Sequence, residues 1–197
     1  MSQPSRREKT RRENHATLVR AARTVFADVG YENATIQEIV RHSELSRGTF
    51  YNYMGDKETA FQEVATELLL EVRAQLLVAR ADATSSEVFI DHAFRAIVTV
   101  LTRDAQTLAL VTHSGAHLRR CLNGLPATQQ ITDDLENDFH GAMAIGLLPQ
   151  FPVQWMTAAM LGATIEVCTR LELGQADEAG DFLSALFLSG VAGFRKR

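Results

Sequence analysis

The sequence contains few residues that interrupt helices. Of its 197 residues only four are proline and 12 are glycine, and no run of alternating apolar and polar residues bounded by turn signals occurs in it. Half-buried β-strands need such alternation, so strands are not expected. Apolar residues instead recur three and four positions apart along most of the chain, which is the spacing of one helix face. The sequence therefore predicts an all-α fold.

Cysteine is also scarce. Cys121 and Cys168 are the only two in the chain, too few for a disulfide framework. The N-terminal segment SQPSRREKTRREN is too polar for a secretory signal peptide. Together these features predict a protein of the reducing cytoplasm.

A hydrophobic run long enough to cross a membrane is missing as well. Residues 141–165 contain no charged side chain, but Pro149, Gln150, Pro152 and Gln154 interrupt them before a bilayer could be spanned. We expect two buried helices joined by a turn here, and no membrane partner.

Net positive charge is absent from the chain as a whole. The formal net charge is −4, with 46% hydrophobic and 22% charged residues, a composition that allows a sizeable core. Up to Lys57, however, ten Lys and Arg oppose seven Asp and Glu, which leaves ten against seventeen beyond it. The first part is therefore basic and the remainder acidic, so contacts with nucleic acid are expected in the first part.

The stretch TIQEIVRHSELSRGTFYNYMGDK, residues 35–57, predicts two short helices that cross at a tight turn. Thr35 and Glu38 have the spacing of a capping box, and Ile36, Ile39 and Val40 form the apolar stripe of a supporting helix. Ser46 can cap a second helix in which Leu45 and Phe50 point into a core. The outer face of that helix is polar: Arg47, Thr49 and Tyr51.

That outer face has the chemistry of a major-groove reader. Arg47 can bond guanine or phosphate, the Thr49 methyl group can pack on a thymine methyl, and Gly48 allows the backbone to approach the duplex. Asp56 can cap the next helix, which places Lys57 near a helix N-terminus, where a phosphate is favoured.

The segment SRGTFYNYMGDKETAF, preceded by TIQEIV and FADVGYENA, resembles the DNA-binding domain of TetR-family transcriptional regulators, the TetR/AcrR-type helix-turn-helix repressors. The resemblance covers Phe26 to Phe61. Glu44 stands where the family often has a turn glycine, and Met54 where it often has an aromatic residue. A non-glycine residue with positive φ at the turn would cost roughly 1 kcal/mol.

The resemblance implies a ligand-responsive repressor that binds a palindromic operator as a homodimer and is released by a small-molecule effector. We expect an N-terminal three-helix helix-turn-helix domain over residues 1–57 and a C-terminal helical domain for effector binding and dimerisation over residues 58–197. Phosphate contacts are assigned to Thr35, Tyr51, Tyr53 and Lys57, and base-edge contacts to Gln37, Arg47 and Thr49, with Gly48 permitting the approach.

Residues 1–12 are rich in Arg and Lys and lack apolar periodicity, which predicts a mobile basic arm. Such an arm could follow phosphates or enter a minor groove, or it could be a solvated leader that binds nothing specific.

The effector pocket implied by the resemblance lies among the helices after Lys57. Its candidate lining residues form an aromatic and methionine stripe with neighbouring histidines, although such a stripe at helical spacing is also typical of ordinary core. An elongated, mainly apolar effector with one polar or anionic group is predicted. The candidates are Phe94, Val98, Leu101, Val111, His113, His117, Phe139 and Met143.

Two apolar helices are predicted at the C-terminal end, from Val153 to about Leu173 and from Asp177 to about Phe194. In a monomer they would expose a large patch, which a second copy removes by forming a four-helix bundle. The predicted interface residues are Trp155, Ala159, Ala163, Val167, Phe182, Leu183, Leu186 and Phe187.

Some residues after Lys57 could serve chemistry other than effector binding. His113, His117 and Cys121 would share one helix face, with His140 nearby, so a metal- or redox-responsive regulator is an alternative, although Arg119 and Arg120 would repel a cation. No cofactor and no resident metal are predicted. No G-x-S-x-G, phosphate-loop or H-E-x-x-H motif occurs, so no enzyme is predicted. A helical interaction adaptor without DNA binding is the third possibility.

Overall fold

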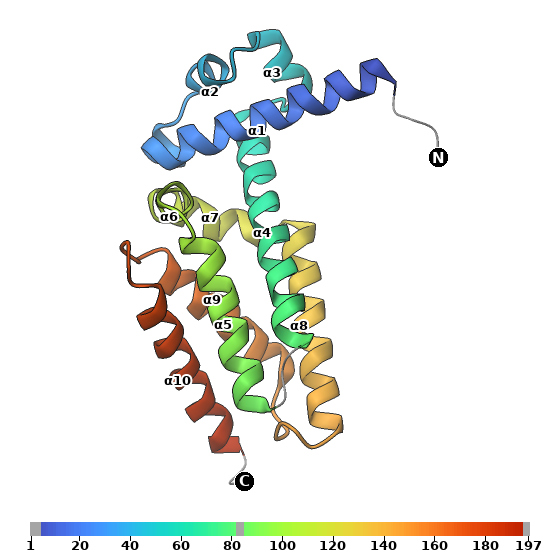
Figure 1. Ribbon diagram of the computed structural model, residues 1–197, viewed down its shortest axis with the longest axis vertical. Coiled ribbons are helices and arrows are strands. Elements are labelled where there is room, and N and C mark those ends of the chain that lie inside the picture. Colours follow the sequence, from blue (N-terminus) through green and yellow to red (C-terminus); the bar gives the residue numbers. More distant parts are fainter. Residues whose placement is uncertain (1–4, 82–84, 195–197) are drawn as a thin grey trace.

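The computed structural model describes residues 5–81 and 85–194, and within them the chain forms ten helices and no strand, so the all-α prediction is confirmed (Figure 1). The helices are α1 (Arg6–Asn33), α2 (Ile36–Ser43), α3 (Arg47–Tyr53), α4 (Lys57–Ala81), α5 (Ser86–Thr102), α6 (Ala105–His113), α7 (Gly115–Leu122), α8 (Pro126–Ala144), α9 (Val153–Cys168) and α10 (Ala176–Phe194).

The N-terminal helices α1, α2 and α3 pack around a small aromatic core. Phe26 of α1, Ile39 of α2 and Phe50 of α3 are each fully buried. Phe61, on the second turn of α4, meets the Phe26 ring edge-on at 5.1 Å between centroids. The core thus draws on four helices, and it holds α2 and α3 against α1 at one end of the molecule (Figure 1).

The basic N-terminal segment is not a mobile arm over its described residues. Helix α1 begins at Arg6, because Ser5 accepts a hydrogen bond from the Glu8 backbone and the Glu8 side chain accepts one from the Ser5 backbone. This reciprocal cap is the Ser-x-x-Glu signature, which the charge run obscured in the sequence. Residues 1–4 of the predicted arm lie outside the described residues.

Helix α4 leaves the N-terminal helices and runs down into the second bundle, where it packs beside α5 and α8 (Figure 1). Its buried positions pass from Phe61 and Val64 at the top to Leu68, Val72 and Leu76 below, as the apolar spacing predicted. Because the first turns of α4 contribute to the N-terminal core, a domain boundary at residue 57 stays a prediction.

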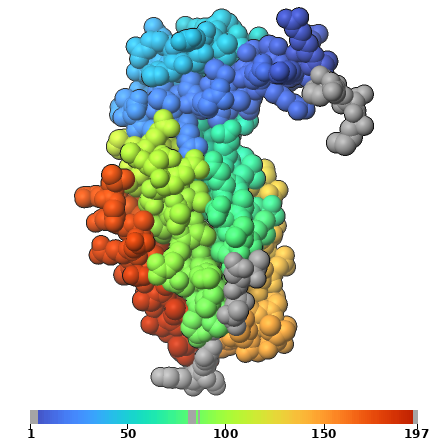
Figure 2. Space-filling model, in the orientation of Figure 1, coloured from blue at the N-terminus to red at the C-terminus, as the bar shows by residue number. Residues whose placement is uncertain are grey.

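The remaining helices complete the second bundle. α10 packs on α5, α9 packs on α8, and α6 lies under α1 (Figures 1 and 2). The uncharged stretch 141–165 forms the end of α8 and most of α9, joined through a turn with buried Leu148 and Phe151. In the described part of the chain, no helix combines the length and apolarity needed to span a bilayer.

Candidate DNA interface and effector cavity

Hydrogen-bonded N-caps start both helices of the helix-turn-helix. Thr35 Oγ1 accepts from the Glu38 backbone at 3.2 Å and the Glu38 carboxylate accepts from the Thr35 backbone at 3.0 Å, which completes the predicted capping box of α2. The Thr35 hydroxyl also donates to that carboxylate at 2.7 Å. Ser46 Oγ accepts from the Thr49 backbone at 3.0 Å and starts α3. These bonds fix the angle at which α3 leaves the turn. They also engage the Thr35 hydroxyl, which was assigned to phosphate.

Helix α3 buries Phe50 and turns its other face to solvent. Arg47, Gly48 and Tyr51 are exposed there, Thr49 is half-buried, and Gln37 of α2 is exposed. The Arg47 guanidinium donates to Tyr51 Oη at 3.3 Å and lies 5.6 Å from the centre of the Tyr51 ring. This i, i+4 pair holds the guanidinium along α3 before any DNA is bound. The base-reading assignments of these side chains stay predictions.

The turn between α2 and α3 keeps its left-handed geometry without glycine. Glu44 has φ 56° and ψ 14°, and it is the one non-glycine residue with positive φ in the described part of the chain. A Cβ in this conformation is strained by about 1 kcal/mol.

Glu44→Gly should therefore raise the free energy of unfolding by about 0.5 to 1 kcal/mol, because glycine adopts positive φ without strain. Glu44→Ala is the control, since it removes the same carboxylate but keeps the Cβ. Urea unfolding of both variants measures the effect. Equal stabilisation by Gly and Ala would attribute it to charge and not to backbone strain.

The Lys57 ammonium is engaged within the protein, and its assignment to phosphate stays a prediction. Its ammonium donates to the carbonyl oxygens of Tyr31 at 2.8 Å, Ala34 at 3.0 Å and Glu32 at 3.4 Å, and it lies 4.4 Å from the centre of the Tyr31 ring. An ammonium has three N–H donors, and all three are engaged. Lys57 therefore closes the C-terminal end of α1 and ties it to α4, where the sequence had suggested a phosphate contact.

A basic groove lies beside α3. The first turns of α1 and the end of α3 line two adjoining surface depressions that share Glu8, Arg11, Asn52 and Tyr53. Arg6 and Arg7 line one of them and Arg12 the other. Tyr53 is half-buried and meets the His15 ring at 6.4 Å. These arginines are exposed, so they add positively charged surface next to α3.

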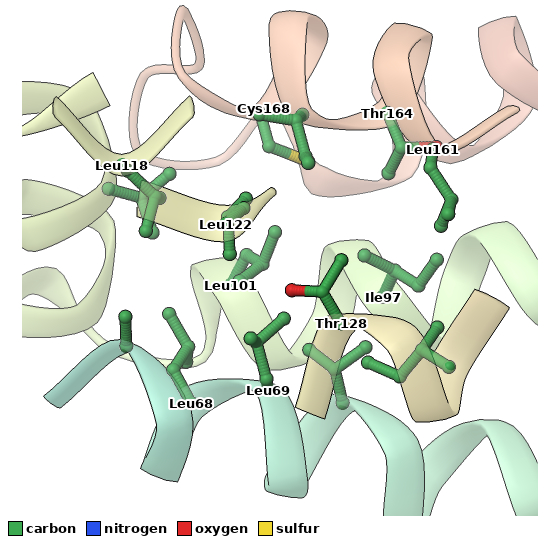
Figure 3. Close-up of a pocket in the computed structure, with 15 residues that line it drawn as sticks. Leu68, Leu69, Ile97, Leu101, Leu118, Leu122, Thr128, Leu161, Thr164 and Cys168 are labelled. Carbon is green, nitrogen blue, oxygen red and sulfur yellow. The ribbon is translucent and has the colours of Figure 1, made fainter. Parts of the chain in front are cut away.

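A second feature is an internal cavity of about 70 Å³ in the C-terminal bundle, enclosed by residues of α4 to α9 (Figure 3). Its walls are mainly aliphatic side chains, including Leu68, Leu101, Leu118, Ile131 and Leu161. The cavity lies on the part of α4 that follows directly after the turns shared with the N-terminal core. Two structural elements, a polar recognition face and an apolar cavity, are thus joined by one helix.

Comparison with known proteins identifies the first of these elements. The family model described as "Bacterial regulatory proteins, tetR family" matches residues 18–64. The A-factor receptor protein of Streptomyces griseus is 39% identical over 51 residues, which are 26% of this chain and 18% of that protein. The HTH-type transcriptional repressor AcnR of Corynebacterium glutamicum is 38% identical over 50 residues, 25% of this chain and 27% of that protein.

The helix-turn-helix region of the chain is thus similar to TetR-family proteins. The chain spans only about a fifth to a quarter of the curated relatives' lengths, because the match is confined to the helix-turn-helix region. Solved structures extend the fold likeness over the chain. A TetR-family regulator from Syntrophomonas wolfei has a TM-score of 0.76 at 17% identity, covering 92% of this chain and 96% of that one. RolR in complex with resorcinol has a TM-score of 0.69 at 24% identity, covering 93% and 90%.

The matched model describes a family of regulatory proteins, which is the class of protein that the sequence predicted.

The structure brings only two of the eight predicted pocket residues to the cavity, Leu101 and Val111. Phe94 and Val98 are fully buried elsewhere, and Phe94 packs on Phe187 of α10 at 5.2 Å. Phe139 contacts the rings of Phe89 and Phe151 in the lower part of the bundle. Met143 is buried near the end of α8. These four side chains belong to the core: Val98 lies at the level of the cavity but is not among its lining residues, and the other three lie on α5 and α8 outside the stretches of these helices that line it.

His113 and His117 lie at the junction between the N-terminal helices and the C-terminal bundle. The predicted single helix from Ala105 to His117 breaks at Ser114, whose hydroxyl accepts from the Tyr31 backbone at 3.1 Å. His113 Nδ1 lies 2.6 Å from the Ala27 carbonyl oxygen. Gly30 approaches His113 so closely that an added Cβ would be 2.7 Å from its carbonyl oxygen, and its φ of 75° kinks α1 there.

His117 contacts both α1 and α4 at this junction. Its ring stacks on Tyr31 of α1, with 3.3 Å between centroids and 7° between planes, and its Nε2 lies 2.8 Å from the Glu58 carboxylate of α4. Tyr31 Oη donates to the same Glu58 oxygen at 2.8 Å, and burial together with this carboxylate raises the pKa of Tyr31. The phenol therefore stays protonated and keeps donating.

The proposed metal constellation does not assemble. The break at Ser114 puts His113 on α6, apart from His117 and Cys121 on α7, and both imidazoles are engaged at the junction. In the described ranges 5–81 and 85–194, no cluster of three or more His, Cys, Asp or Glu residues could hold a metal ion. Burial raises the pKa of Cys121 to about 11 and that of Cys168 to about 12. Thiols with such pKa values are poor nucleophiles, which disfavours the redox alternative.

The predicted dimer residues divide into two groups. Trp155 is 76% exposed, Phe182 56% and Leu186 50%, while Ala159 is also exposed and Ala163 and Val167 are half-buried. Leu183 and Phe187, in contrast, are buried within the protomer and pack toward α5. These two were wrongly placed on the outer face, because α10 is apolar on both sides and the sequence does not show which side faces inward.

Proposed function

We propose that this chain is a ligand-responsive transcriptional repressor that binds a palindromic DNA operator as a homodimer. The observation that carries the proposal is the exposed face of α3 with Arg47, Gly48, Thr49 and Tyr51, set on a capped helix-turn-helix within the region matched by the family model. Basic first turns of α1 lie next to that face and supply further phosphate contacts. A protein with this role works where the chromosome is, in the bacterial cytoplasm.

Dimerisation is supported by the outer faces of α9 and α10. Three large apolar side chains there, Trp155, Phe182 and Leu186, are at least half exposed, and small residues between them allow close helix approach. An apolar surface of this kind is expected to be covered by a partner. A two-fold pairing through α9 and α10 places two copies of α3 so that they can read symmetric half-sites.

The cavity is the proposed effector site. RolR was solved with resorcinol, and the A-factor receptor protein is by its name a receptor, so small-molecule binding by this chain is a consistent proposal. Leu118 and Leu122 of α7 line the cavity, and His117, next to Leu118, contacts Tyr31 and Glu58. Ala65 and Leu68 line it from α4, on the helix that carries Lys57 and Glu58.

A ligand that displaces α7 or α4 therefore acts directly on the groups that hold α1. Lys57 and Glu58 fix the end of α1 through Tyr31, so a shift of α4 alters the position of the whole helix-turn-helix. In a dimer such a shift changes the separation of the two α3 helices, and the affinity for DNA changes with it.

An in vitro selection tests the proposal. The full-length protein is incubated with a pool of random duplex DNA, and bound molecules are amplified and sequenced over several rounds. We expect enrichment of an inverted repeat whose half-site centres lie about one helical turn apart or slightly more. The adaptor alternative predicts no enriched sequence, and that outcome would reject the proposed function.

A further inference from the structure

The cavity contains one hydrogen-bonding group that the fold leaves unused. Thr128 lies in the first turn of α8, and its Oγ1 is buried without a hydrogen-bond partner among the described residues. Figure 3 shows this oxygen directed into the pocket, toward Leu101. A buried hydroxyl without a partner is unfavourable, and such groups are uncommon in folded proteins.

Other threonines in the helices are satisfied locally. Thr102, Thr132 and Thr164 each donate to the carbonyl oxygen of the residue four positions earlier. Thr164 also lines the cavity, but its hydroxyl is engaged with Met160 at 2.7 Å. Thr128 lies in the first turn of α8, so the residue four positions earlier, Gly124, is outside the helix, and the Leu125 carbonyl oxygen already accepts from the Thr128 and Gln129 backbones. Its hydroxyl is therefore free to bond a molecule in the cavity.

The other lining residues limit what that molecule can be. None of the described residues that form the cavity wall is charged, and most are Leu, Ile, Val or Ala. A buried carboxylate or ammonium would lose its hydration without gaining a counter-charge, which is strongly unfavourable. The volume of about 70 Å³ is roughly half that of an apolar cavity of about 150 Å³ that binds benzene. Three of the side chains that line it, Leu69, Ile97 and Leu161, are only partly buried.

We propose that the cavity selects a small uncharged molecule, about one ring in size, which carries a single hydroxyl or carbonyl group that hydrogen-bonds to Thr128. This inference rests on the proposed function in taking the cavity as the effector site, and it replaces the elongated or anionic effector expected from the sequence.

Three probes of matched shape test the selection: phenol, toluene and benzoate. Dissociation constants are measured by thermal-shift titration of the full-length protein. We expect Thr128→Val to raise the ratio of the phenol to the toluene dissociation constant about fivefold relative to the parent protein, since a neutral hydrogen bond contributes about that factor. Benzoate should not bind. Without ligand, Thr128→Val should unfold about 2–4 °C higher, because an unsatisfied hydroxyl has been removed.

Two control variants distinguish the effect of the Thr128 hydroxyl on binding from the effects of a changed cavity wall and of a more stable fold. Thr164→Val also changes the cavity wall but removes a hydroxyl that the backbone already satisfies, so the ratio should not change. Thr157→Val removes another buried hydroxyl without a partner among the described residues, at a position outside the cavity wall, so it should stabilise the protein and leave the ratio unchanged.

Three results would overturn the inference: an equal ratio in the parent protein and Thr128→Val, binding of benzoate as tight as that of phenol, or no binding of any probe. DNA selection with the same preparations keeps the two proposals apart. Enrichment of a palindrome together with any of these results rejects the ligand class alone. Failure of the selection rejects the repressor function, while the phenol to toluene ratio still decides the chemistry of the cavity.

Discussion

Leu186→Glu is expected to convert the protein from a dimer into a monomer. Leu186 is 50% exposed and lies on the outer face of α10, which we propose as part of the dimer interface. In the dimer the new carboxylate would be buried without a partner, which typically destabilises by about 3–5 kcal/mol, so the dimer dissociation constant should rise more than 100-fold. Light scattering at micromolar concentration measures the change directly.

Operator affinity should fall when dimerisation is lost. Two linked recognition helices gain about 10² to 10⁴ in affinity over one, because the second contact is intramolecular. The monomer should therefore bind a palindrome little better than a single half-site, while its helical content remains that of the parent protein.

Leu77→Glu is the matched control for this change. Leu77 is a leucine of similar exposure, 48%, but it lies on α4, away from α9 and α10. The variant should remain dimeric. If Leu77→Glu gives monomers and Leu186→Glu does not, the interface is on α4 and our assignment to α9 and α10 is wrong.

Arg47→Ala is expected to weaken binding to the selected operator and to leave binding to random DNA nearly unchanged. Loss of one base-reading arginine costs about 1–3 kcal/mol per half-site, or roughly 5- to 150-fold, and applies only where its base is present. The Arg47 guanidinium donates to Tyr51 Oη, which holds it along α3. Fluorescence anisotropy with labelled operator and random duplexes gives both constants.

Arg170→Ala controls for net charge. Arg170 is an exposed arginine that follows α9 in the C-terminal bundle and pairs with Glu166. Its removal changes the formal charge as Arg47→Ala does, yet both DNA affinities should stay the same. If Arg47→Ala weakened operator and random DNA equally, Arg47 would be a phosphate contact and not a base reader.

The sequence predicted the helix-turn-helix well because its signals are local. A capping box, an N-cap serine and a buried Phe50 each act within a few residues, so Thr35, Ser46 and Phe50 could be placed without knowing the fold. The same rule was available for Ser5 and Glu8, but the surrounding arginines suggested an arm and concealed the cap.

Long-range contacts could not be predicted in this way. Lys57 closes the end of a helix more than twenty residues away, and His117 stacks on Tyr31, which is remote in sequence. Periodicity shows that Phe94 and Phe139 face inward. It does not show whether each ring lines a cavity or packs against another ring, as both do here. Thr128, whose hydroxyl is buried at the cavity without a hydrogen-bond partner, could not be recognised from the sequence. Whether this hydroxyl finds a partner depends on the turn that precedes α8.

The most direct test of sequence-specific DNA binding is the ratio of two dissociation constants of the parent protein, one for the selected operator and one for a random duplex of equal length. Anisotropy titrations at several salt concentrations near physiological ionic strength provide it. We expect the operator to bind at least about 10³-fold more tightly, and both affinities to fall linearly on a log–log plot against salt. Equal affinity for the two duplexes at every salt concentration would contradict the proposed function.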